Sequence, residues 1–244
     1  MNQPKYLEIL AVLRERCSSL AVGVRLPAER ALAEEFGVSV MTVRRSLAAL
    51  QDEGWVRRAP GSGTYVGRPT VTMGPTLTSF TEDMRRRGIR PSSTVLRFEP
   101  VTPDLETVTN LSLRPGEGAL LLERLRYADG EPMCHEMGLY PERFGDALAG
   151  ADLTGSVHEA LSEVAAVPDS TFRRVRALVL PPVECELLGL PLDSPGLEIV
   201  DTFYDATGRP VQHVRSRYRF DRYEVLTCIT RISGNQPEPG RPAV

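Results

Sequence analysis

Three consecutive helical patterns followed by a glycine-containing hairpin constrain the fold of the first 67 residues more than any other feature of the sequence. Apolar residues that recur at helical spacing predict helices over 5–17, 26–36 and 39–53. Two short strands, expected over 55–58 and 64–67, enclose a turn that contains Pro60, Gly61 and Gly63. This order of elements predicts a winged helix-turn-helix.

Residues at the expected helix ends support this assignment. Pro27 suits the first turn of the second helix, where its missing N–H costs nothing, and Gly37 suits a C-terminal cap. Ser39 is expected to cap the third helix. That helix combines an apolar stripe of Val43, Leu47 and Leu50 with a polar, cationic remainder that includes Met41, Thr42, Arg44 and Arg45. The stripe predicts a small core, the cationic face predicts contact with a DNA major groove, and the hairpin glycines would let backbone approach the sugar-phosphate.

The charge distribution agrees with a nucleic-acid module joined to another domain. The whole chain has a formal net charge of −3, which taken alone argues against DNA binding. Up to Pro69, however, there are ten basic and seven acidic residues, whereas the remainder has nineteen basic and twenty-five acidic residues. A basic segment of +3 is therefore attached to an acidic body of −6.

Beyond a Pro-, Gly- and Thr-rich linker expected over 68–78, strands and helices intermix for roughly 150 residues. This mixture predicts a single α+β domain. The expected strands are 94–98, 119–127, 133–139, 173–180, 197–204 and 211–220. The expected helices are 79–87, 103–111, 156–164 and 183–188. The Pro-rich end predicts a frayed tail.

Several chemistries find no support in the sequence. The four cysteines lie far apart without a CxxC pair, and the three histidines form no HExxH or HxH motif, so no metal site and no cofactor are expected. Gly61, Gly63 and Gly67 do not fit the GxGxxG spacing, and no GxSxG elbow points to nucleophilic catalysis. No apolar run approaches the roughly 20 residues of a membrane helix. The N-terminus lacks the apolar core of a signal peptide, so we expect a cytoplasmic protein with no membrane partner.

The N-terminal pattern resembles the DNA-binding domain of GntR-family bacterial repressors. The residues that carry this resemblance are 25–30 (RLPAER), 32–39 (LAEEFGVS), 41–44 (MTVR), Gly54 and 61–66 (GSGTYV). The resemblance implies that Arg30, placed at the end of the second helix, contacts a base or phosphate of the operator. It also implies that Thr42, Arg44 and Arg45 lie at the major groove and that Gly61 and Gly63 of the wing meet the minor groove. Position 40, which commonly holds a base-contacting arginine in this family, is Val40 here. Val40 either packs or contacts a thymine methyl group, so the operator preference can differ from that of relatives.

The remainder resembles the effector-binding UTRA domain of the HutC branch, which has a chorismate-lyase-like architecture. The resemblance is carried by 79–84 (SFTEDM), Gly88, 123–126 (ERLR), 129–132 (DGEP), 155–156 (GS), 188–190 (LGL), 208–210 (GRP) and 216–223 (SRYRFDRY). The implied organisation is a winged helix-turn-helix over 1–67, a linker over 68–78, an effector-binding and dimerisation domain over 79–233 and a tail over 234–244.

The same resemblance implies an effector pocket made by Phe80, Thr81, Arg124, Arg126, Glu136, Ser156, His158, Gln212 and Tyr218. On a strand, Arg124 and Arg126 point to one face, where the two guanidiniums repel each other unless an anion or a carboxylate lies between them. They can therefore grip an anionic ligand or form ordinary pairs with Glu123 or Glu136. Ser156 is expected to begin a helix whose amides attract anions. Relatives that bind amino-sugar phosphates often have Tyr and Glu where His158 and Gln212 stand.

These observations predict a homodimeric transcription factor, most simply a repressor, that binds a palindromic operator and is released or modulated by a small anionic metabolite such as a sugar phosphate or carboxylate. Two other functions remain open at this point. One is a chorismate-lyase-like enzyme fused to a DNA-binding domain, which the missing catalytic constellation disfavours. The other is a DNA-bound scaffold that needs no ligand. The sequence identifies neither the operator nor the metabolite.

Overall fold

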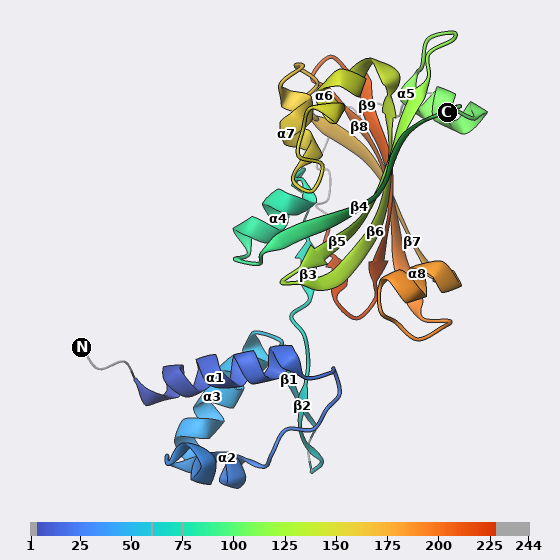
Figure 1. Cartoon of the computed structure of the whole chain (residues 1–244). Helices are drawn as coiled ribbons and strands as arrows, with labels where there is room; N and C mark the ends of the chain where they lie inside the picture. Colours follow the sequence, from blue (N-terminus) through green and yellow to red (C-terminus); the bar gives the residue numbers. More distant parts are fainter. Residues whose placement is uncertain (1–3, 60, 75, 228–244) are drawn as a thin grey trace, which may run out of the picture.

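The computed structural model describes residues 4–59, 61–74 and 76–227, which form a small helical domain and a larger sheet domain (Figure 1). The small domain contains α1 (Lys5–Ser19), α2 (Glu29–Phe36), α3 (Val40–Asp52), β1 (Val56–Ala59) and β2 (Gly63–Val66). β1 and β2 pair as an antiparallel hairpin. The predicted winged helix-turn-helix is therefore present, with the wing strands starting within one residue of their expected positions.

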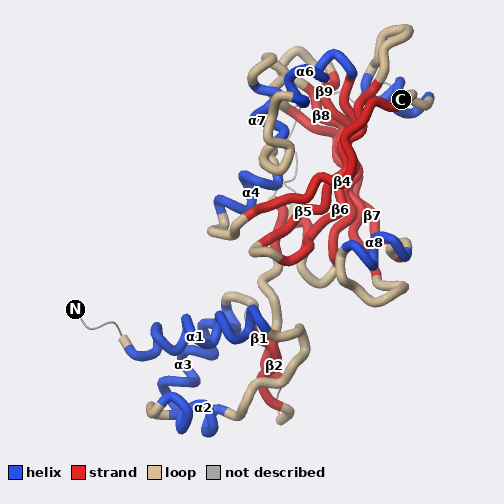
Figure 2. The backbone as a smooth tube through the Cα atoms, viewed as in Figure 1, coloured by secondary structure: helices blue, strands red, loops and turns tan. Residues whose placement is uncertain are grey.

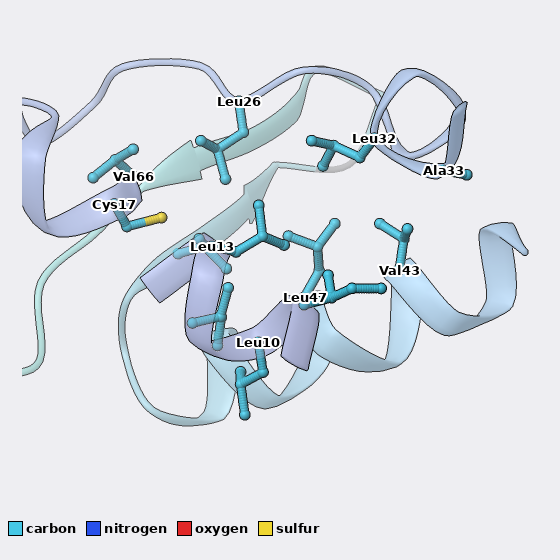
Figure 3. Close-up of a cluster of buried hydrophobic side chains, with 12 residues drawn as sticks. Leu10, Leu13, Cys17, Leu26, Leu32, Ala33, Val43, Leu47 and Val66 are labelled. Atoms are coloured by element: carbon cyan, nitrogen blue, oxygen red, sulfur yellow. The ribbon is translucent and has the colours of Figure 1, made fainter. Parts of the chain in front are cut away.

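The core of the small domain is made by the apolar stripes that the sequence shows. Leu13, Leu32 and Leu47 are almost completely buried, and they meet between the three helices and the hairpin (Figure 3). Leu50 belongs to the same buried cluster. Burial of each such side chain contributes about 1.5–3 kcal/mol to folding. Because the α3 stripe faces inward, the other side of α3 is left on the surface.

Two expectations for helix ends are confirmed and one is wrong. Gly37 ends α2 with a left-handed φ of 62°, and the Ser39 side chain accepts a hydrogen bond from Thr42 N at the start of α3. Pro27, in contrast, lies outside α2, which begins at Glu29 after Ala28. The resemblance placed Arg30 at the end of the second helix, but Arg30 lies in the first turn of α2.

The larger domain is built on one antiparallel sheet of six strands in the order β4-β5-β6-β9-β8-β7. The strands are β4 (Pro91–Val101), β5 (Ala119–Ala128), β6 (Glu131–Pro141), β7 (Ser170–Val179), β8 (Pro195–Tyr204) and β9 (Pro210–Arg219). All six strands expected from the sequence are present. The register opposite Arg124 places Val95 on β4 and Glu136 on β6, so alternate residues of neighbouring strands form one continuous face.

Short helices lie against both faces of this sheet (Figure 2). They are α4 (Phe80–Arg86), α5 (Leu105–Leu111), η1 (Glu142–Phe144), α6 (Gly145–Ala149), α7 (Val157–Ser162) and α8 (Pro182–Leu187). α4, α6 and α7 lie on one side of the sheet, whereas α5 and α8 contact strands from the other side (Figure 1). The side chains of Leu122, Tyr140, Leu148 and Leu161 fill a core under α6 and α7.

The linker expected over 68–78 is in part regular structure, which corrects the expectation of an irregular segment. Residues Val71–Met73 form β3, which pairs in parallel with β10 (Tyr223–Val225) near the other end of the described chain. The paired residues Thr72 and Glu224 are 152 positions apart in the chain, so this pairing leaves no local signal in the sequence. The expected tail over 234–244 and the end of the expected domain at 233 lie outside the described residues.

Candidate functional site

The surface of α3 that faces away from the core holds the residues expected to contact DNA. Ser39 Oγ and Thr42 Oγ1 lie 2.8 Å apart at the N-terminus of α3 and fix its first turn. Thr42, Arg44 and Arg45 line one shallow groove together with Met41, whose side chain is 66% exposed. The helix therefore presents hydrogen-bond donors beside the exposed apolar side chain of Met41.

Each arginine of this surface has a defined environment. Arg44 donates to Glu29 Oε2 from Nε at 3.0 Å and from Nη2 at 2.9 Å. The guanidinium of Arg45 lies over the ring of Tyr6, 3.9 Å from its centroid. Arg30 is exposed, and it lines a second shallow groove together with Val40, the position where the family commonly has an arginine.

The wing glycines play different parts. Gly61 lies in the turn with φ 72°, and open space surrounds the position where a Cβ atom would be. Gly63 has φ 130°, and a Cβ there would lie 2.8 Å from Nε of Arg25. The close approach at Gly63 is thus made by an arginine of the same chain, which packs along the hairpin. The contact of Gly61 and Gly63 with DNA stays a prediction.

A buried cavity lies in the larger domain between the sheet and the helices α4 and α7. Its volume of about 70 Å³ is enough for roughly five water molecules or a small polyatomic group. Eight of the nine residues expected to bind the effector line it: Phe80, Arg124, Arg126, Glu136, Ser156, His158, Gln212 and Tyr218. These residues come from α4, β5, β6, α7 and β9 and converge only because the strands pair in register.

Thr81 is the exception, because its side chain contacts Arg126 instead of the cavity. Thr81 is 3% exposed, and its Oγ1 accepts a hydrogen bond from Arg126 Nη2 at 2.9 Å. The ring of Phe80 lies 4.6 Å from the guanidinium carbon of Arg126 on another side. Two consecutive residues at the start of α4 therefore hold one arginine, and Thr81 acts through that arginine.

Glu136 lies between the two arginines, as one of the two interpretations of the sequence required. Its Oε1 accepts hydrogen bonds from Arg124 Nε at 2.9 Å and from Arg126 Nη1 at 3.4 Å. Arg124 is 3% exposed, Arg126 2% and Glu136 8%. Burial alone would raise the pKa of Glu136, but Arg124 and Arg126 outweigh it and lower that pKa to about 2. The carboxylate is therefore ionised at neutral pH.

The cluster keeps an excess of donors after this pairing. Two guanidiniums and one carboxylate carry a net charge of +1, and Arg126 Nε has no hydrogen-bond partner among the described residues. Arg124 uses its Nη1 on the carbonyl oxygens of Leu153 and Gly155, at 2.9 and 3.1 Å. An uncompensated donor in a buried cavity is costly unless a ligand or water accepts from it.

Two further residues of the cavity wall, His158 on α7 and Gln212 on β9, carry no charge. Burial lowers the pKa of His158 to about 4, so its imidazole is neutral at pH 7. Gln212 Nε2 lies 2.9 Å from His158 Nε2, and Gln212 Oε1 has no partner among the described residues. Ser156 precedes α7 but its side chain caps no amide, and α7 has only six residues, so the expected anion attraction by this helix is weak.

Several groups of the cavity wall were not predicted from the sequence, chief among them an ion pair. Arg173 Nε donates to Asp201 Oδ1 at 2.7 Å, and the two residues are directly opposite each other on β7 and β8. Asp83, Tyr140 and Tyr223 also line the cavity. The alternation of apolar and polar residues in the two expected strands was the available signal for the ion pair. It could not be used without the register that joins them.

A groove between α4 and α7 continues the cavity to the surface. Ser79, Ser156 and His158 line both the cavity and the groove. Across this groove, Arg85 Nη1 lies 3.5 Å from Glu159 Oε1, and both side chains are more than half exposed. The groove therefore adjoins the cavity at Ser79, Ser156 and His158.

Other kinds of site find no support in the described part of the chain. No group of three or more His, Cys, Asp or Glu side chains is placed to hold a metal ion there. None of the helices described is long and apolar enough to cross a membrane. Cys17, Cys134 and Cys185 are buried free thiols, whereas Cys228 lies outside the described residues.

Comparisons with known proteins agree with both halves of this structure. Residues 5–66 match the family described as bacterial regulatory proteins, gntR family, and residues 86–224 match the UTRA domain. The chain is 30% identical over 234 residues to the HTH-type transcriptional repressor NagR of Bacillus subtilis, covering 94% of this chain and 96% of that one. It is also 30% identical over 236 residues to the mannosyl-D-glycerate transport/metabolism system repressor MngR of Escherichia coli, covering 95% and 98%.

The architecture agrees with a solved relative as well. The crystal structure of PhnF from Mycobacterium smegmatis superposes with a TM-score of 0.72 at 26% sequence identity, over 91% of this chain and 99% of that chain. NagR and MngR are named as repressors and both domain matches are to regulator families, so the open possibility of an enzyme is set aside. The chain belongs to the GntR family of bacterial transcriptional regulators, with a UTRA domain as its second half, and it is a repressor-type DNA-binding protein.

Proposed function

We propose that this regulator binds a palindromic operator as a homodimer in the cytoplasm and that a small anion carrying hydroxyl groups, such as a sugar phosphate or a sugar carboxylate, releases it. The observation that carries the ligand class is the cavity wall. It combines the cluster of Arg124, Arg126 and Glu136, which has a net charge of +1, with the neutral His158 and Gln212, and Arg126 Nε has no hydrogen-bond partner among the described residues.

The DNA half of the proposal rests on the exposed face of the small domain. Arg44 and Thr42 on α3 would read or clamp the major groove, with Arg45 and Arg30 at its edges. The wing, with Gly61 at its tip, would meet the minor groove beside it. Replacing Arg44 by alanine should weaken specific binding by about 1–3 kcal/mol if this side chain reads a base.

The dimer is supported by the unequal edges of the sheet. At one edge, β4 carries prolines at both ends and a register shift at Val95 to Arg97, features that block pairing with another strand. At the other edge, β7 pairs with β8 in an unbroken register over ten residues and leaves Val175 and Val179 exposed. Two copies joined through β7 would carry two DNA-binding domains, as a palindromic site requires.

The ligand class is supported from the donors and acceptors that the cavity leaves unused. The anionic group would occupy the cavity, where its oxygen can accept from Arg126 Nε and a hydroxyl group can donate to Gln212 Oε1. The rest of a sugar-sized ligand would extend into the adjoining groove between α4 and α7. The relative MngR is named for a system that handles mannosyl-D-glycerate, a glycosylated carboxylate, and this name agrees with an anion that carries hydroxyl groups. The Arg124–Arg126 pair then supplies a charge-assisted bond from each side chain, worth about 1.5–3 kcal/mol.

A contact network joins the two domains and is the proposed route from ligand to DNA. Arg68 donates to the carbonyl oxygens of Cys17 and Leu20 at the end of α1, both at 2.7 Å, and to Glu131 at 2.8 Å. Arg222 also pairs with Glu131. One carboxylate of the larger domain therefore holds two arginines, of which one caps a helix of the DNA-binding domain.

The cavity contacts the same two segments that carry these arginines. Met73 of β3 and Tyr223 of β10 line the cavity, and Tyr223 stacks on Tyr218 with ring centroids 3.8 Å apart. A ligand that shifts β3 and β10 would shift Arg68 and Arg222 with them. Because a ligand acts only through different affinities for two states, it must favour an arrangement in which the DNA-binding domains are mis-spaced.

Binding of a selected duplex, followed by fluorescence anisotropy, tests the proposal. Glucose 6-phosphate, 3-phosphoglycerate and glucosylglycerate serve as probes, and glucose serves as the uncharged control. At least one anionic probe should release the DNA from the wild-type protein, whereas Arg126→Gln, which leaves Arg124 paired with Glu136, should bind DNA normally and ignore every probe. Normal release from that variant would show that the anion binds elsewhere. Equal binding of DNA with every probe would favour a scaffold that needs no ligand.

A further inference from the structure

Glu29, the first residue of α2, lies between two arginines of the DNA-facing surface. Its Oε2 accepts both hydrogen bonds from Arg44 on α3, and its Oε1 lies 3.5 Å from Arg58 Nη2 on the wing strand β1. Arg58 Nη2 also donates to the main-chain oxygen of Arg44 at 3.3 Å. A single carboxylate therefore connects α2, α3 and the wing at the point where they would meet DNA.

The geometry leaves the binding edge of Arg44 free. A guanidinium has five N–H donors, and Glu29 takes one on Nε and one on Nη2. Of the three remaining donors, one on Nη1 donates to Met41 Sδ, a weak acceptor, at 3.8 Å, and the other two have no partner among the described residues. Two parallel donors at that end match the O6 and N7 acceptors of guanine. Glu29 thus holds the Nε–Nη2 edge of the guanidinium and leaves the Nη1–Nη2 edge for DNA.

Glu29 places a negative charge on the surface that is proposed to meet the DNA phosphates. A carboxylate on a surface that meets phosphates opposes the counterion-release attraction, which acts on any DNA sequence. Glu29 is 27% exposed in its side chain, between two arginines that are 51% and 32% exposed. Its position lowers general attraction to DNA while it fixes the direction of one arginine. Both effects increase the difference between the operator and other DNA.

We propose that Glu29 is a positioning residue that determines operator specificity by orienting Arg44 toward a guanine. This inference rests on the proposed DNA contact of Arg44. It extends that proposal to a residue that touches no base, and it predicts a G·C pair in each half-site that is read through the Glu29–Arg44 pair.

The test compares Glu29→Gln with the wild type on DNA selected by the full-length wild-type protein from a randomised duplex library. Affinities are measured for the selected duplex, for single-base variants at each G·C pair and for an unrelated duplex. Glu29→Gln should lose at least about fivefold of discrimination at one G·C pair per half-site, the lower end for a bidentate contact. Its affinity for the unrelated duplex should hold or rise. Glu35→Gln is the matched control, because Glu35 is on the same helix but pairs with Arg16.

The outcomes distinguish a failure of the positioning role of Glu29 from a failure of the proposed DNA contact of Arg44. Wild-type discrimination by Glu29→Gln overturns the inference, as does a variant that only melts at a lower temperature. In an Arg44→Ala background, Glu29→Gln should cause no further loss at that base pair, and a further loss would show that Glu29 acts independently. If Arg44→Ala itself discriminates normally, or if no duplex is enriched, the proposed DNA contact fails and the inference with it.

Discussion

Replacing Glu136 by glutamine should destabilise the larger domain because it leaves two buried guanidiniums side by side without a counter-charge. Arg124 and Arg126 are both at least 97% buried, and Glu136 is the carboxylate that contacts both. Removal of one partner from a buried ion pair costs about 3–5 kcal/mol. The total free energy of unfolding of a typical domain is about 5–15 kcal/mol, so the loss should be large in urea or thermal unfolding.

Inorganic phosphate should reverse part of this loss, because an anion in the cavity can replace the missing carboxylate. A ligand that binds only the folded state adds about 2.7 kcal/mol at a hundred times its dissociation constant. We therefore expect the melting temperature of Glu136→Gln to rise with phosphate at constant ionic strength, and to rise more than that of the wild type. Sulfate should act in the same way.

Glu123→Gln provides the control for this experiment. Glu123 is on β5, where it pairs with Arg97 and with His135 on the opposite face of the sheet, away from the cavity. This variant should lose stability without any specific recovery by phosphate. Equal recovery of both variants would mean that phosphate acts through the general salt environment. A Glu136→Gln variant as stable as the wild type would refute the argument that the two arginines need a counter-charge.

Other consequences can be measured separately. The pKa of His158 is about 6.5 in the unfolded state and about 4 in the folded state, so between these values the unfolded state binds more protons. The free energy of unfolding should therefore fall as the pH decreases through this window, by about 2 kcal/mol at pH 5. Urea unfolding of His158→Gln should show a flatter pH profile. Glu131→Gln should break the ion pairs of Arg68 and Arg222 with this residue. A releasing probe should then still bind, as measured by calorimetry, but should lose much of its effect on DNA binding. Undiminished release would place the coupling elsewhere. Val175→Lys on the open edge should shift the protein toward the monomer in sedimentation, whereas Leu96→Lys at the shifted register of β4 should not. Leu47→Ala should cost about 2–5 kcal/mol in the DNA-binding domain, since Leu47 is 1% exposed, and a cost under 1 kcal/mol would contradict the described core.

Local patterns in the sequence were sufficient for the DNA-binding domain. Its three helices and its hairpin each have a period or a turn signal within a few residues, as the stripe of Val43 and Leu47 and the Ser39 cap show. The alternation of Arg124, Leu125 and Arg126 likewise predicted that both arginines share one face of a strand. Such features depend only on the neighbours of each residue along the chain, so a single sequence contains them.

The partners of those residues depend on contacts between distant segments. The sequence left open whether Arg124 and Arg126 face a ligand or a carboxylate, and only the pairing of β5 with β6 placed Glu136 between them. The strand in the expected linker, the Arg173–Asp201 pair and the contact of Glu29 with Arg44 appear only once the chain is folded. Hydrophobic periodicity determines which face of an element is buried, whereas strand register and helix packing determine which charges meet. For this protein, the sequence by itself determined the two domains and the location of the arginines, and the tertiary structure decided what each arginine binds.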